Sequence, residues 1–511
     1  MGTWSRVAGL VLVLGFVAGR DAAAKDGIKR PAELLVTISL GPDHTLDGMR
    51  AFANAIRPGA GSTLTEGLVR QQLAGMADVD SIDGLDPNAS TYVLVVDDGA
   101  ALKGAAVVGK VRDAKAIAAL GAGLSVVKNG WAVVGAKPLV HKLAPYALAT
   151  LPALAPVTSP TAVVYVPQVL ARYQTEIGAG REQFLKQVAT AQGSAQMSAM
   201  MESIVDGMFS LVADSEQLVV AVDVTKDVGA IDIAMTPKPG SRLAKFVTAQ
   251  RPSDYGLLAK LPAVKAPMLF TGHIDSGPYR QGMLHILAMM YGQGASKDLV
   301  DAIATIMSTA TGEFALAGQM APKQPMEITQ MFGLADQKVA DKSIDRLLEL
   351  FKAGLTFDAV GVATTIKTSI TVVHDGISLK GYDVTYDLSK LSAETRANME
   401  KMVPTGKAVH ASIATFDQIG LATMGGADAA TAVDAARGKG AHFTPPAMIA
   451  DFLIGSRARK ESFMMAMDVA AFAGVGGTGQ PFIMSAGFAD KAAHLRFTVP
   501  ASTVRTLSGQ P

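Results

Sequence analysis

The sequence contains no cysteine among its 511 residues. This excludes disulfides, thiolate metal sites, a cysteine nucleophile and a lipid anchor attached through cysteine. An excess of charge of one sign is also missing, because 46 Lys and Arg residues stand against 45 Asp and Glu residues. There is therefore no electrostatic reason to expect nucleic acid or anionic lipid as a partner. With only two tryptophans, a carbohydrate cleft of stacked rings is not expected either.

Long hydrophobic runs are absent after the N-terminus, although 49% of the residues are hydrophobic. This composition predicts large buried cores and no membrane span after signal cleavage. The N-terminus itself combines Arg6, an apolar stretch over 7–19 and the small residues Ala22-Ala23-Ala24, which is the pattern of a cleaved signal peptide over 1–24. An uncleaved anchor is the alternative, but the apolar stretch is shorter than the roughly 20 residues that a span needs. We expect export to the periplasm, the cell envelope or the medium.

What the sequence does contain is an internal duplication. Three pairs of similar segments occur in the same order, 231 to 246 residues apart: 29–56 with 260–290, 128–135 with 374–381, and 161–177 with 407–423. The first and third pairs read as a strand running into a helix. The second pair carries Asn129-Gly130 and Asp375-Gly376, which are signals for two-residue hairpins. The repeats predict a first α+β domain over 25–252 and a second over 253–511.

Hairpins outnumber plausible parallel crossovers, so the fold class is α+β, two tandem related domains with mainly antiparallel sheets packed against helices. The recurring unit reads β-α-α-β-β-α. In the second copy, helices are expected over 280–291, over 391–402 and near 415–437. With its signal peptide, its 82-IDGLDP-87 turn before a strand and its repeated strand–helix openings, the chain resembles exported bacterial proteins of unknown function with duplicated α+β halves. That resemblance implies a location and a fold, and no activity.

The most acidic stretch is 78-DVDSIDGLDPN-88, in which Asp78, Asp80, Asp83 and Asp86 are candidate calcium ligands. A calcium loop of the EF-hand type needs oxygen ligands at its positions 1, 3 and 5 and a glycine at position 6. Ile82 occupies position 5 when the count starts at Asp78, and position 3 when it starts at Asp80. We therefore expect successive turns that lead into the strand 91–97, with an irregular calcium site as the alternative.

Segments that resemble a phosphate loop and a dinucleotide-binding motif occur, but neither meets the requirements of its motif, and the sequence has no histidine zinc motif. The segment 104-GAAVVGK-110 is followed by Val111 where a phosphate loop needs Ser or Thr, and its interior reads as a strand. The segment 474-GVGGTG-479 is not followed by the helix that a dinucleotide fingerprint opens. The eight histidines form no H-E-x-x-H motif. We expect no cofactor and no metal.

One segment, 273-HIDSGPYR-280, combines several reactive or binding side chains at a predicted strand-to-helix junction. Alternation along the strand predicts His273 and Asp275 on one face, with Ser276 near the turn; the remaining candidate binding residues are Tyr279 and Arg280. The first segment of the duplication has Asp43 and His44 at the equivalent place, but in another order and without the serine. A structural cap with a solvated surface is the alternative to a binding site.

Two functions follow from these features. The first is a non-catalytic envelope protein that binds a partner protein, a lipid or a small apolar ligand. The second is a secreted hydrolase whose dispersed residues meet at the inter-domain cleft. A carrier should contain an apolar cavity of several hundred Å³, whereas an enzyme should hold titratable groups within hydrogen-bonding reach of one another in a polar pocket. A scaffold should instead expose an apolar patch.

Overall fold

The computed structural model describes residues 29–508, apart from 42–43, 101, 155–158, 193–194, 264–267, most of 276–296, 320–326, 353, 360–361, most of 390–407, 470–479 and 490. The segment 474–479 lies outside the described residues. Most of each expected helix, over 280–291 and over 391–402, also lies outside them. The chain divides into two compact units. The first comprises the residues up to Ile177, Leu211–Leu243 and the residues from Lys491 on, and the second comprises Gly178–Ser210 and Ala244–Asp490.

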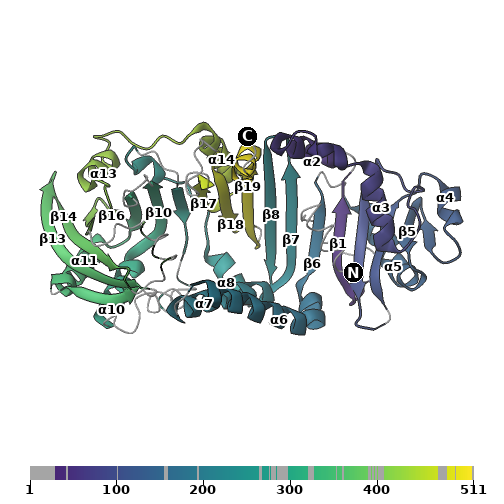
Figure 1. Cartoon of the computed structure of the whole chain (residues 1–511), viewed down its shortest axis with the longest axis horizontal. Helices are drawn as coiled ribbons and strands as arrows, with labels where there is room; N and C mark the ends of the chain where they lie inside the picture. Colours follow the sequence, from purple (N-terminus) through teal and green to yellow (C-terminus); the bar gives the residue numbers. More distant parts are fainter. Residues whose placement is uncertain are drawn as a thin grey trace. The chain divides into compact units, whose positions relative to one another are not determined.

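The described residues of the first unit form nine strands, and every pairing between them is antiparallel (Figure 1). In the order of their pairing, the strands are β4 (Ser125–Lys128), β5 (Trp131–Gly135), β3 (Lys103–Lys110), β2 (Thr91–Asp97), β1 (Leu34–Leu40), β6 (Thr161–Tyr165), β7 (Ser215–Val224), β8 (Val228–Pro237) and β19 (Ala493–Pro500). The α+β class and the antiparallel pairing expected from the sequence are confirmed.

The apolar run in β2 reflects burial on both faces of the sheet. Tyr92, Leu94 and Val96 belong to a core on one face, and Val93 and Val95 belong to a core on the other. Successive side chains of a strand point to opposite faces, so a strand covered on both sides is apolar throughout. Helix α3 (Glu66–Ala77) and α4 (Ala114–Ala119) contribute to the core of one face, and α5 (Lys137–Thr150) to the core of the other.

A buried carboxylate joins β2 to the start of α6 (Val166–Gln192). The side chain of Asp97 is 1% exposed. It accepts hydrogen bonds from Arg172 Nε at 2.8 Å, from the Tyr173 hydroxyl at 2.5 Å and from the Gly99 N–H at 2.8 Å. Burial raises the pKa of Asp97, but the hydrogen bonds from Tyr173 and Arg172 outweigh burial and hold this pKa below its usual value. Tyr173 also marks a kink in α6, where its φ is −121° and its ψ is 22°.

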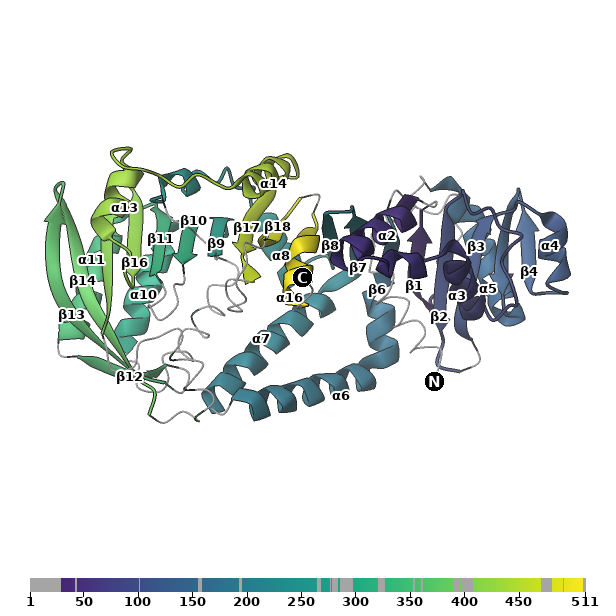
Figure 2. The same cartoon turned by 45° about the horizontal axis from the view of Figure 1, so that its top comes forward.

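The described residues of the second unit form ten strands, again antiparallel in every pairing (Figure 2). In the order of their pairing, they are β12 (Leu355–Ala359), β13 (Val362–His374), β14 (Ile377–Asp387), β15 (Val409–Phe416), β16 (Ile419–Met424), β11 (Glu327–Leu334), β10 (Ala310–Gln319), β9 (Met268–His273), β17 (Glu461–Met467) and β18 (Phe482–Gly487).

Helices cover the second unit's strands from two sides. Helices α13 (Ala429–Ala436) and α14 (Ala447–Ala458) contribute to the large core that contains Leu269, Ala315, Met331 and Leu421. Helix α11 (Gln337–Lys352) packs against β13, β15 and β16, and α10 (Lys297–Thr309) packs against α11. The alternation of β15 separates these layers, because Phe416 enters the core with α13 while the neighbouring Thr415 bonds to Asp341 of α11.

Both predicted two-residue hairpins are confirmed. Asn129 and Gly130 have φ values of 52° and 76°, and Asp375 and Gly376 have values of 50° and 77°. Positive φ at both positions is what the tight turn between twisted antiparallel strands requires.

The expected helix near 415–437 is wrong in its first half. Residues 419–424 form β16, which follows β15 through a turn where Asp417 and Gln418 have φ values of 46° and 60°. The segment is a strand because it pairs with β15 on one side and with β11 on the other, and this tertiary pairing overrides the helix propensity of its residues. In the third pair of similar segments, 161–177 does run from a strand into a helix, but 407–423 contains the hairpin of β15 and β16. The predicted domain division at residue 252 stays a prediction.

Candidate functional site

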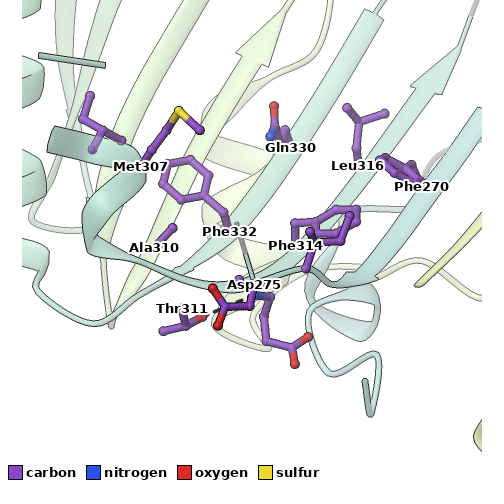
Figure 3. Close-up of a pocket in the computed structure, with 13 residues that line it drawn as sticks. Phe270, Asp275, Met307, Ala310, Thr311, Phe314, Leu316, Gln330 and Phe332 are labelled. Carbon is purple, nitrogen blue, oxygen red and sulfur yellow. Dashed lines mark hydrogen bonds between the residues drawn. The ribbon is translucent and has the colours of Figure 1, made fainter. Parts of the chain in front are cut away.

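A pocket of about 540 Å³ lies on one face of β9, β10 and β11, beside α10 (Figure 3). Alternation along the strands builds its floor. On β10, Ala315 and Ala317 point into the core with α13 and α14, while Phe314 and Leu316 line the pocket. The full lining is Phe270, Ile274, Asp275, Ile306, Met307, Ala310, Thr311, Gly312, Glu313, Phe314, Leu316, Gln330 and Phe332.

Strand register sets the aromatic side chains of the floor next to one another. Phe314 is directly opposite Phe332 on β11, and Leu316 is directly opposite Phe270 on β9. The rings of Phe270 and Phe314 lie 4.7 Å apart between centroids at an angle of 53°. Phe332 occupies space that only a glycine at position 420 leaves free, because a Cβ there would stand 2.2 Å from the Phe332 ring. Directly opposite pairs of this kind are the contacts that stabilise a sheet, so the floor is preformed.

The candidate residues of 273–280 take different roles. Strand β9 ends at His273, and Asp275 lies in the following loop, where its N–H donates to Gln250 Oε1 and its carbonyl accepts from Gln250 Nε2. The expectation that His273 and Asp275 share one face of a strand is therefore wrong, because the side chain of Gln250 takes over the backbone pairing of Asp275. Asp275 lines the pocket. Ser276, Tyr279 and Arg280 lie outside the described residues.

His273 is 3% exposed and belongs to a polar cluster that shares Glu313 with the pocket lining. The Nε–H of Arg251 faces its ring, 3.2 Å from Nε2 and 3.3 Å from Nδ1. Its Nδ1 lies 3.4 Å from Glu313 Oε1, and Ser253 Oγ donates to Glu313 Oε2 at 3.0 Å. Gly312, with φ at +94°, keeps this space open, since a Cβ there would stand 2.6 Å from the His273 ring. Both ring nitrogens therefore face protein groups, and the histidine orients Glu313 instead of facing the pocket.

The acidic stretch 78–88 is occupied by turns and by contacts with protein groups. The N–H of Leu85 donates to the carbonyl of Ile82, and Asp83 forms an ion pair with Arg70 at 3.2 Å. Asp86 Oδ1 accepts from the N–H of Asn88, closing an Asx turn. Within the described residues, no three His, Asp or Glu side chains, including those of Asp78 and Asp80, gather as metal ligands would.

A Ser–His–Asp arrangement occurs on β14 and β15, with its serine held inside the sheet. His410 Nδ1 lies 2.9 Å from Asp383 Oδ1, and its Nε2 lies 3.4 Å from Ser412 Oγ. Ser412 is only 8% exposed and stands mid-strand, paired with β14 on one side and with β16 on the other. Its backbone N–H is engaged in that ladder, whereas acyl transfer needs N–H groups aimed at the developing oxyanion.

Comparisons with known proteins add no relative: no family model, curated protein or solved structure matches the chain. Within the described residues, the helices are too short or too polar to span a membrane. Sequence reasoning singled out Asp275 but missed Phe270, Phe314, Phe332 and Glu313. The signal that could have found them is the alternation of large and small apolar residues in 313-EFALAG-318.

Proposed function

We propose that this is an exported, non-catalytic protein that binds a small apolar ligand in the pocket formed by α10, β9, β10 and β11. The observation that carries the proposal is the pocket itself. Its volume of about 540 Å³ falls within the range of small-molecule sites, and most of its lining is aliphatic or aromatic. A few polar groups in the lining provide orientation, as is usual for such sites. Export rests on the signal-peptide pattern of residues 1–24.

A solvatochromic dye tests this proposal. Nile red should bind saturably to the protein, with one site. A tryptophan at position 310, Ala310→Trp, fills the pocket from the start of β10 and should abolish binding. The matched control is Val127→Trp, which adds the same ring to an exposed position of β4 in the other unit. Equal dye affinity in Ala310→Trp and the parent, with both folded by circular dichroism, would reject the pocket as the binding site. Native mass spectrometry of protein from its own host then identifies a bound molecule.

A second candidate, a protein partner, is favoured by the edge of β13. Strand β12 pairs with β13 only as far as Ile366. Beyond it Ile370 is 77% exposed and Val373 71% exposed, and residues 368–373 carry no charge. Apolar, uncharged edges of this kind pair with other strands. The partner we propose is a second copy that pairs edge to edge. Sedimentation velocity should then show a dimer that Ile370→Lys converts to a monomer; a parent that is monomeric at all concentrations would refute it.

The finer reading of the fold, a duplication, is also a proposal. It is supported by topology: β1 pairs with β2 and β6, and β9 pairs with β10 and β17, all antiparallel. Each of β2 and β10 continues into a hairpin partner, β3 and β11 respectively. This equivalence matches the first pair of similar segments, 29–56 with 260–290. It aligns β6 with β17, and not with the segment 407–423.

A further inference from the structure

The pocket has a polar end formed by two carboxylates. Asp275 and Glu313 both line it, together with Thr311. Figure 3 shows Asp275 and Thr311 on the side of the pocket away from Leu316 and Gln330. The remaining lining consists mainly of aliphatic and phenyl side chains, so the site has one acidic end and an apolar body.

Neither carboxylate is balanced by a permanent cation in the described part of the chain. Asp275 Oδ1 accepts the N–H of Gly277 at 2.8 Å. Glu313 accepts from Ser253, and its other oxygen faces His273. No Lys or Arg among the described residues lies within ion-pair distance of either group. Arg251, the cation of this cluster, directs its Nε–H to His273.

Two negative charges beside a low-dielectric, aromatic surface attract a cation more strongly than they would in water. Phenyl faces add to this attraction, because their quadrupole favours an ammonium group placed over the ring. The same charges repel a carboxylate ligand. Aromatic rings combined with carboxylates are the chemistry that recognises amines and quaternary ammonium groups.

We propose that the ligand is a cationic amphiphile, with one amine or quaternary ammonium head at Asp275 and Glu313 and an apolar tail over Phe270, Phe314 and Phe332. This inference rests on the proposed function and adds the chemical class of the ligand. The head pairs with the carboxylates, and the tail replaces water over the phenyl floor.

Displacement of Nile red by three single-chain ligands of equal length tests the inference: dodecyltrimethylammonium, dodecanol and dodecanoate, each below its micelle concentration. The full chain should bind the ammonium ligand about tenfold more tightly than the alcohol, and dodecanoate most weakly. The double variant Asp275→Asn with Glu313→Gln keeps shape and removes both charges. In it the ammonium and alcohol ligands should differ by less than about twofold. The control Asp301→Asn removes an exposed charge from α10, outside the pocket lining, and should keep the parent's preference.

The outcomes separate the two claims. If the dye binds and is displaced equally by all three ligands, the cationic class is wrong and the apolar site stands. If the preference survives in the double variant, or is lost equally in Asp301→Asn, the two carboxylates are not its source and the inference fails. If neither dye nor alkyl ligand binds the folded parent, the proposed function fails together with the inference.

Discussion

Replacing Asp97 by asparagine should destabilise the first unit by about 2 kcal/mol at neutral pH. The carboxylate is almost completely buried and accepts hydrogen bonds from Arg172 and Tyr173. Hydrogen bonds to a charged group contribute roughly 1 kcal/mol more than those to a neutral one. Asparagine keeps the shape and one acceptor, so two such bonds each lose about that amount. For a unit of this size the melting temperature should fall by roughly 4–8 °C.

The loss should also depend on pH. Because the pKa of Asp97 is lowered in the folded state, its contribution is fully present above the usual aspartate pKa of about 3.9 and is lost as the pH falls through the folded value. The difference in unfolding free energy between the parent and Asp97→Asn should therefore stay constant from neutral pH down to about pH 4 and shrink below it. Because the other carboxylates titrate alike in the parent and in the variant, their contribution cancels in this difference in unfolding free energy.

Trp131 provides the assay, since it lies in β5 of the same unit and is the only tryptophan after residue 4. Urea unfolding followed by its fluorescence reports the sheet that contains β2. The control is Asp98→Asn, because the exposed Asp98 accepts backbone N–H bonds from Ala100 and Leu102. This variant should change stability by less than about 0.5 kcal/mol. Equal losses in the two variants, or a loss in Asp97→Asn that does not vary with pH, would refute the role assigned to the buried charge.

Three further predictions concern two glycines, a buried tyrosine and the acidic stretch 78–88. Gly130→Ala should lower the free energy of unfolding by about 1 kcal/mol, because φ is +76° at Gly130 and alanine is strained there even though the space is open. Gly75→Ala, inside α3 and also in open space, should raise the free energy of unfolding by about 0.5–1 kcal/mol, because alanine restricts the unfolded chain. Both are measured by urea unfolding. Burial raises the pKa of Tyr255 to about 12, so stability should fall as the pH rises above about 10. Tyr255→Phe should remove one late-ionising tyrosine from an absorbance titration. Asp83→Asn with Asp86→Asn should leave melting unaffected by calcium or a chelator; a calcium-dependent shift that only the parent shows would restore the metal site.

Local patterns predicted most of the elements correctly. The strand 91–97 begins and ends where the sequence analysis placed it. Both hairpins carry positive φ at the predicted turn residues, because turn chemistry is a property of two adjacent residues. The helix predicted at 419–424 is wrong because the state of that segment is not set by adjacent residues. There, the state of the segment depends on β15 and on β11, whose nearest residue lies 85 positions earlier in the chain.

The candidate site was predictable only in part. Asp275 was named because polar residues cluster after β9, and it does line the pocket. Glu313 was not named, since nothing near it in sequence indicates that it faces the same space. His273 was named as a binding residue, but its ring is buried between Arg251 and Glu313. Which face of a strand looks into a cavity depends on the layers packed around the sheet, and those come from distant segments.

Composition, periodicity and turn residues thus determined the α+β class, the antiparallel pairing within hairpins and the absence of cysteine chemistry, because each depends on the residue types present or on neighbours within a few positions. Tertiary structure alone decided which strands pair across long distances and which residues meet. The rows Phe332–Phe314 and Gln330–Leu316–Phe270 arise only when β11, β10 and β9 align in one register. An apolar pocket with two carboxylates at one end is therefore a property of the packed sheet, and of no single segment within it.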